Sequence, residues 1–197
     1  MISHKLRAVF IHIPKCGGTS IERILDKQSF VYQKHPHICH RELDSNHDNY
    51  FKFAFVRNPF DKLVSEYKWF TNTEYKYPCK RVKDFYKGVD FKTFLKKFTD
   101  WPTRKSDHWY VRGDYYHGLD YMHILQPIGQ MDFIGRFENL QQDFDFICDK
   151  IDIPRQKLPH IYKSNHRHYT EYYDAEAQEI VAKRYGKDIE HFGYKFM

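Results

Sequence analysis

The sequence predicts an α/β protein with a parallel β-sheet flanked by helices, because it twice places a buried strand before a polar turn and an amphipathic helix. Apolar runs at residues 6–13 and 51–56 are rich in β-branched and aromatic side chains, which favours strands. Strand, turn and helix in repeated order are how a parallel sheet is assembled. A chain of 197 residues is long enough for one domain with a hydrophobic core.

Helix signals follow the strands and continue to the end of the chain. Asn58 is a natural N-cap, and Pro59 suits the first position of the helix behind residues 51–56. Apolar residues then recur at helical spacing, at Phe60, Leu63, Val64 and Tyr67. Further helices are expected after the cap residue Asp90, from Leu140 to a stop before Pro154, and from about Asp174 to Gly193. Short strands are expected at residues 30–33 and 131–134.

Composition restricts the class of partner. The net charge of +6 favours anionic partners, but Lys and Arg are spread along the chain, so a nucleic-acid-binding tail is not expected. No stretch approaches the roughly 20 apolar residues that cross a bilayer, so no transmembrane segment is expected. The four cysteines are too scattered for a disulfide scaffold, which favours a reduced, cytoplasmic protein.

A glycine-rich turn links the first strand to the first helix, whose apolar face begins at Ile21. Its glycines allow the backbone to approach an anion, and the start of a helix offers unpaired N–H donors. Lys15 adds a charge and the hydroxyls add donors. The order of Lys and Gly differs from a Walker A loop. A plain βα turn with a helix cap remains an alternative for these residues, which are Lys15, Cys16, Gly17, Gly18, Thr19 and Ser20.

A second polar turn follows the strand at residues 51–56. Arg57 ends this strand, and Ser65 lies two helical turns after Asn58, so it projects on the same side as the start of the helix. We expect Arg57 and Ser65 to close on one phosphate, with Arg57 as a bidentate donor. Taken alone, Arg57 is also typical of a surface ion pair, and Ser65 of an ordinary helix face.

Together the two turns resemble motifs of a known family. Residues 14–20 resemble the 5′-phosphosulfate-binding motif of sulfotransferases that use 3′-phosphoadenosine 5′-phosphosulfate (PAPS), and residues 57–65 resemble their 3′-phosphate-binding motif. Residues 133–140 and 192–194 are similar to the carbohydrate sulfotransferase branch. The resemblance implies a single P-loop-like domain over residues 1–197, with a central parallel β-sheet flanked by helices. It also implies a PAPS donor and no metal. Lys15 would steady the leaving group, and Cys16 would contribute its backbone N–H.

A cluster of histidines is the source of the expected base. Transfer to a hydroxyl benefits from a group that takes the proton of the acceptor, and histidine has a suitable pKa. Sulfotransferases of this kind carry a His five residues before a Glu-Leu pair, which implies His37, with His35 in reserve. A zinc site is the rival reading of the same cluster, built from His35, His37, Cys39 and His40, with Cys79 able to join.

The remaining expectations concern the end of the chain and the acceptor. In sulfotransferases a late basic loop closes over the nucleotide, which implies Lys163 and Ser164 as donor-binding residues. The acceptor is expected to be a carbohydrate or another small hydroxyl compound. A P-loop-like nucleotide kinase and a basic nucleic-acid-binding protein are the rival functions. If the chain is the lumenal domain of a larger Golgi enzyme, the cytoplasmic expectation fails, and a Cys39–Cys79 bridge becomes possible.

Overall fold

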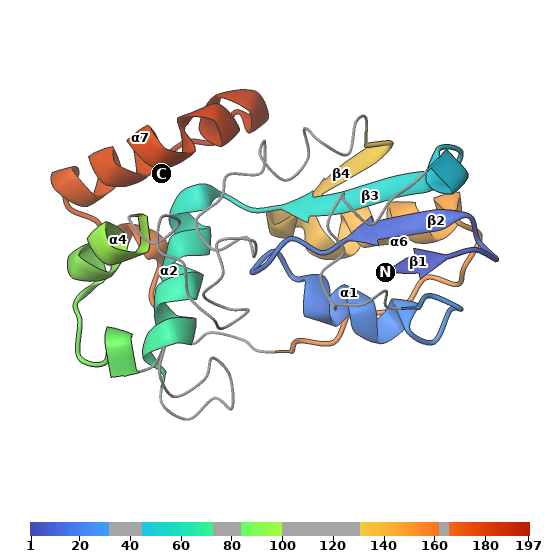
Figure 1. The fold of residues 1–197 in the computed structure, drawn as a ribbon, viewed down its shortest axis with the longest axis horizontal. Coiled ribbons are helices and arrows are strands. Elements are labelled where there is room, and N and C mark those ends of the chain that lie inside the picture. The colour runs from blue at the N-terminus through green and yellow to red at the C-terminus, as the bar shows by residue number, and fades with distance from the viewer. Residues whose placement is uncertain (32–44, 73–83, 100–130, 162–165) are drawn as a thin grey trace. The chain divides into compact units, whose positions relative to one another are not determined.

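The computed structural model describes residues 1–31, 45–72, 84–99, 131–161 and 166–197 (Figure 1). The strands are β1 (Ile2–Ser3), β2 (Ala8–Ile11), β3 (Phe51–Val56) and β4 (Phe133–Arg136). The α-helices are α1 (Gly18–Leu25), α2 (Pro59–Thr71), α4 (Phe91–Thr99), α6 (Leu140–Lys150) and α7 (Ala175–Phe192). Short 3-10 turns are η2 (Ser45–His47), η5 (Phe137–Asn139) and η6 (Tyr169–Tyr172). The predicted α/β class is therefore confirmed.

The four strands form one sheet in the order β1-β2-β3-β4. Strands β2, β3 and β4 are parallel, as predicted, and β1 adds an antiparallel edge strand that the sequence did not signal. Strand β4 lies two residues later than predicted, because pairing with β3 continues through Gly135 to Arg136. Of the strand expected at residues 30–33, the structure describes only an isolated bridge between Val31 and Ile2.

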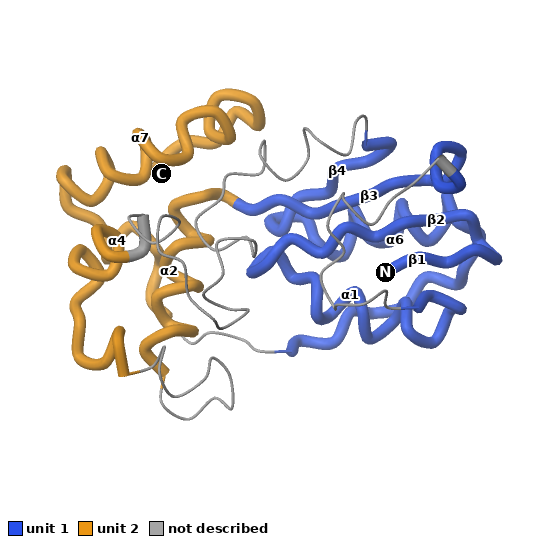
Figure 2. Tube along the Cα trace, viewed as in Figure 1, with its two compact units in different colours: residues 1–57, 121–163 blue, residues 58–120, 164–197 orange. Residues whose placement is uncertain are grey.

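Backbone contacts divide the chain into two compact units (Figure 2). We call residues 1–57 and 121–163 the sheet unit, since they carry all four strands, together with α1 and α6. We call residues 58–120 and 164–197 the helical unit, which carries α2, α4 and α7. The single domain expected over residues 1–197 stays a prediction.

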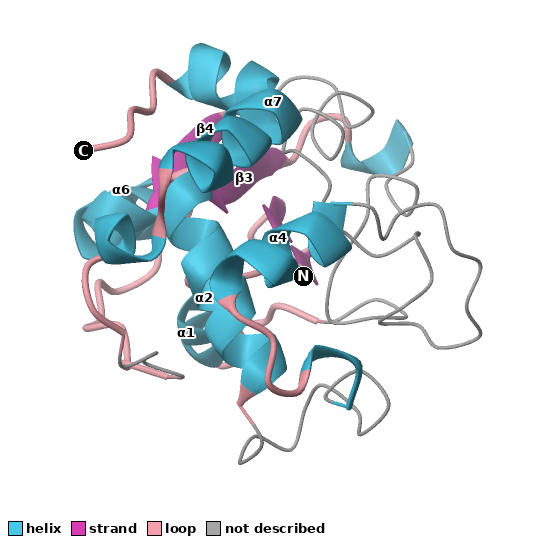
Figure 3. Cartoon of the chain, turned by 90° about the vertical axis from the view of Figure 1, so that its left-hand side faces the viewer, coloured by secondary structure: helices cyan, strands magenta, loops and turns pink. Residues whose placement is uncertain are grey.

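Helices α2, α4 and α7 pack side by side in the helical unit (Figure 3). The predicted cap residues act as caps: the Asn58 side chain accepts a hydrogen bond from the Phe60 N–H at 3.1 Å, and the Asp90 side chain accepts one from the Thr93 N–H. Asp174, at the expected start of the last helix, also caps its helix by accepting from the Ala177 N–H. Helix α7 ends at Gly193, as predicted, and this glycine has a left-handed conformation. The helices enclose an aromatic core that includes Phe60, Phe70, Tyr86, Phe94 and Tyr185.

Within the described residues, none of the helices combines the length and the apolar character that crossing a membrane requires.

Candidate anion-binding site

The glycine-rich loop connects β2 to α1 in the sheet unit through a backbone of unusual shape. Lys15 has φ 64° and Gly17 has φ 81°, so both lie in the left-handed region. This region suits glycine, whereas a lysine placed there costs about 1–3 kcal/mol of backbone strain. Gly17 is the N-cap of α1 and offers no side-chain cap to the first turn. Because Gly17 supplies no cap, the N–H groups of the first turn are suited to bind an anion at this helix start.

Close packing leaves no room for a side chain at either loop glycine. A Cβ atom on Gly17 would lie 2.7 Å from Leu140 Cδ2, at the start of α6. A Cβ atom on Gly18 would lie 2.1 Å from His12 Cδ2, because the imidazole packs directly against the loop. The two glycines therefore let the loop fit between α6 and the end of β2.

His12 and Glu22 form a buried pair beneath the loop. The two residues are 7% and 6% exposed, and His12 Nδ1 lies 2.7 Å from Glu22 Oε1. This hydrogen bond orients the ring that touches Gly18. Our reading of the sequence missed the pair. Two signals mark it: a histidine within the buried apolar run at residues 8–13, and a glutamate on the face of α1 that carries Ile21 and Leu25.

Arg57 joins the loop to the carboxyl end of the neighbouring strand. It follows β3, is 5% exposed, and donates a hydrogen bond from Nη1 to the Lys15 carbonyl oxygen at 3.0 Å. Its Cζ atom lies 3.9 Å from the ring centroid of Phe137. The structure thus brings together Lys15 and Arg57, which the sequence assigned to two different phosphate-binding motifs.

The remaining loop residues differ in exposure. Thr19 is half-buried, whereas Ser20 is buried in the first turn of α1. Cys16 is also buried, and its thiol donates to the Pro14 carbonyl oxygen at 3.4 Å. This contact leaves the loop backbone, rather than the sulfur, as the expected contribution of Cys16 to an anion.

An open groove of about 540 Å³ lies beside Ser20, within the sheet unit. Leu140 and Gln141 of α6 line one part of it, and residues 155–160 line another. Gln141 fixes the second part, because its amide nitrogen donates to the Gln156 carbonyl at 3.0 Å and its amide oxygen accepts from the Leu158 N–H at 2.8 Å. The groove has the size of a small-ligand site and begins where the loop ends.

Comparison with known proteins assigns the sequence to a family. A sequence model described as the sulfotransferase family matches residues 1–195. The chain belongs to the sulfotransferase family. The family resemblance seen in the two motifs is thereby confirmed.

Individual sulfotransferases extend this result. Carbohydrate sulfotransferase 14 of Homo sapiens is 25% identical over 191 residues, which covers 82% of this chain and 47% of the relative. Carbohydrate sulfotransferase 9 of Homo sapiens is 24% identical over 227 residues, covering 95% and 47%. Carbohydrate sulfotransferase 10 of Xenopus laevis is 25% identical over 242 residues, covering 98% and 66%. The chain spans about half the length of the first two relatives.

The other predicted site residues lie in the helical unit or fall outside the described residues. Ser65 is buried in α2 of the helical unit, whereas Arg57 ends the first segment of the sheet unit, so their meeting on one phosphate stays a prediction. His37, Lys163 and Ser164 fall outside the described residues. So do the four candidate zinc ligands at residues 35–40 and Cys79. Among the residues that the structure does describe, no group of three or more His, Cys, Asp or Glu side chains gathers to hold a metal.

Proposed function

We propose that this protein transfers a sulfuryl group from PAPS to a hydroxyl or amine group of a carbohydrate. One observation carries the proposal: Arg57 donates directly to the carbonyl of Lys15, so residues expected at the two ends of one nucleotide are neighbours. Family membership supports the same activity, and three of its relatives are named carbohydrate sulfotransferases.

The loop would hold the 5′-phosphosulfate of the donor. Its backbone N–H groups and the start of α1 supply donors and positive potential to an anion. Lys15 would stabilise the bridging oxygen as that oxygen gains charge in the transition state. The left-handed conformation of Lys15 supports this role, because backbone strain of this kind is typical of functional sites.

The 3′-phosphate would be bound by Arg57 and Ser65, with Lys163 and Ser164 closing over the nucleotide. A guanidinium has five N–H groups in one plane, so Arg57 can hold the Lys15 carbonyl and donate to a phosphate at once. The nucleoside between the phosphates would occupy the groove beside Ser20, whose volume suits a group of that size.

In the transfer step the acceptor oxygen or nitrogen would attack sulfur in line with the bridging oxygen. The new bond to sulfur forms while the bond from sulfur to the bridging oxygen breaks, which releases 3′-phosphoadenosine 5′-phosphate. His37 would take the proton of the acceptor, a contribution of about 10²–10⁴-fold to the rate. The net charge of +6 favours acidic carbohydrate acceptors.

The test of donor class is a binding measurement with 3′-phosphoadenosine 5′-phosphate, ADP and AMP. We expect the compound with the 3′-phosphate to bind at least about tenfold more tightly, because the bidentate contact of Arg57 is available only to it. Arg57→Ala should remove this preference. Equal binding of ADP would contradict the proposal, and ATP-dependent phosphorylation of an acceptor would indicate the rival kinase.

The test of acceptor class is transfer of labelled sulfate from PAPS onto a panel of neutral and acidic glycans. His37→Ala should lower turnover by about 10²-fold or more while leaving donor affinity near normal. Full turnover in this variant would exclude His37 as the base, with His35→Ala as the next variant to measure. Transfer to aromatic alcohols but to no glycan would contradict the proposed acceptor class.

A further inference from the structure

Phe137 touches both parts of the candidate site. Its ring centroid lies 3.9 Å from Cζ of Arg57. Its Cδ2 atom would lie 3.3 Å from a Cβ atom on Gly17, so the same ring also packs against the glycine-rich loop. Phe137 is an apolar residue between two groups that are expected to bind phosphates, and it has no role in the proposed chemistry.

The parallel register of the sheet puts Phe137 in this position. Val56, the last residue of β3, pairs with Arg136, the last residue of β4. Arg57 directly follows β3, and Phe137 directly follows β4. The two residues therefore leave the sheet side by side, at the carboxyl ends of neighbouring strands. Phe137 then opens η5, which leads into α6 and Leu140, the other side chain against Gly17.

The contact restrains Arg57 without using its donors. A cation over the face of an aromatic ring is attracted by the quadrupole of the ring. The N–H groups of a guanidinium point outward in its plane, so stacking on a ring leaves their directions unchanged. One of them already meets the Lys15 carbonyl at 3.0 Å. The ring therefore favours one orientation of the guanidinium, the orientation in which Arg57 also holds the loop.

We propose that Phe137 is a positioning residue that orients Arg57 for the 3′-phosphate of the donor while it supports the loop for the 5′-phosphosulfate. This inference rests on the proposed function. It makes the discrimination between 3′-phosphorylated and plain nucleotides depend on an aromatic ring that donates no hydrogen bond to either phosphate.

The test compares Phe137→Leu with Phe137→Tyr. Leucine keeps apolar cover on Gly17 but removes the ring face, whereas tyrosine keeps both. Phe146→Leu is the matched control, since Phe146 is an aromatic residue of the same unit that pairs with Phe133, at a centroid distance of 4.7 Å, and not with Arg57. For each variant we would measure the dissociation constants of 3′-phosphoadenosine 5′-phosphate and AMP, and the thermal unfolding midpoint without nucleotide.

We expect Phe137→Leu to lower the preference for the 3′-phosphorylated nucleotide about tenfold, because a partly desolvated cation–π contact is of that size. Affinity for AMP should change much less. Tyrosine and the Phe146 control should keep the wild-type preference. If Phe137 had a purely structural role, the leucine variant would instead bind both nucleotides more weakly by the same factor. That loss of affinity would go along with a lower unfolding midpoint.

Two negative results are distinguishable. If the wild-type protein prefers the 3′-phosphate and Phe137→Leu keeps that preference, the positioning role is wrong and the proposed donor stands. If the wild-type protein shows no preference, the proposed donor is wrong and the role of Phe137 falls with it. Phe137→Met, which keeps a large apolar side chain without a ring, replaces the leucine variant should that variant fail to fold.

Discussion

The sheet unit and the helical unit bury ionisable side chains in different settings. In the sheet unit, His12, Glu22 and Arg57 are buried near a loop with left-handed residues, and Ser20 at the end of that loop lines an open groove. In the helical unit, Lys62 and Glu66 are 1% and 0% exposed, 3.4 Å apart, and belong to successive turns of α2 within the aromatic core. One arrangement distorts the backbone, and the other leaves it helical.

The difference indicates which buried charges serve ligand binding. A strained loop that holds buried polar groups and ends at an open groove is typical of a site built for a ligand. Charges paired at i,i+4 inside a closed core affect folding, since each depends on the other to offset its lost hydration. Substitutions in the sheet unit should therefore change function more than stability, and those at the buried pair should do the reverse.

The largest expected effect on stability comes from Lys62→Met. This change leaves the carboxylate of Glu66 buried without the Lys62 ammonium, which costs about 3–5 kcal/mol. Urea unfolding followed by circular dichroism measures the loss, and the exposed Lys87→Met is the control for a lysine-to-methionine change. A loss equal to that of the control would show that the buried pair contributes nothing.

The largest expected effect on function comes from Lys15→Ala. Removing a cation that stabilises charge in the transition state should lower turnover by about 10²–10³-fold. The free energy of unfolding should change little, because the side chain is half-buried and alanine keeps the same strained, left-handed backbone. Steady-state transfer assays on this variant and on the exposed Lys27→Ala make the comparison. Turnover within a few-fold of the wild type would contradict the role of Lys15.

A smaller effect is expected from an extra methyl group on a glycine in each unit. Gly18→Ala places a Cβ atom against the His12 ring and should weaken nucleotide binding about tenfold by shifting the loop. Gly186→Ala in α7 meets no atom within 4 Å and should be neutral or slightly stabilising. Titration calorimetry and thermal unfolding distinguish the two results. If both substitutions had the same effect on nucleotide binding and on unfolding, the proposed functional difference between the two units would be wrong.

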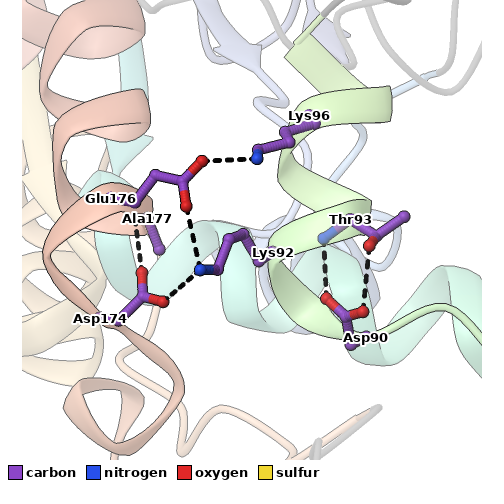
Figure 4. A network of polar contacts seen from close by, with 7 residues as sticks. All are labelled: Asp90, Lys92, Thr93, Lys96, Asp174, Glu176 and Ala177. Atoms are coloured by element: carbon purple, nitrogen blue, oxygen red, sulfur yellow. Dashed lines mark hydrogen bonds and ion pairs between the residues drawn. The ribbon is translucent and has the colours of Figure 1, made fainter.

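The smallest effect is expected from the exposed network between α4 and α7 (Figure 4). Hydrogen bonds from Lys92 lower the pKa of Asp174, and those from Lys96 and Lys92 lower the pKa of Glu176. A carboxyl group whose pKa is lowered by folding stabilises the protein at pH values above its unfolded pKa, which is about 4. This contribution is lost as the pH falls through the pKa of the folded state.

Lys92→Met tests this pH dependence. The unfolding midpoint of the variant should lie below that of the wild type at neutral pH, and the gap should close at about pH 2, where the carboxylates are protonated in both states. It should also narrow in high salt, because exposed charges are screened. A gap that stays constant with pH would assign the effect to packing of the lysine stem.

Local patterns predicted most of the secondary structure. Residues 51–56 form β3 as expected, and the predicted cap residues Asn58 and Asp90 both accept a backbone hydrogen bond at the start of their helices. These signals depend on side chains only a few residues apart, so they can be recognised in a single sequence. The antiparallel β1 escaped prediction, because its two residues are too few to show a period.

The sequence by itself determined that a strand, a glycine-rich turn and a helix bear Lys15, and that Arg57 ends a second strand. Both follow from local spacing. Only the tertiary structure decided that Arg57 reaches the Lys15 carbonyl, that Phe137 lies on its guanidinium, and that His12 with Glu22 supports Gly18. These contacts are set by strand register and helix packing. They join residues far apart in the sequence, and no local sequence pattern around either residue indicates the other.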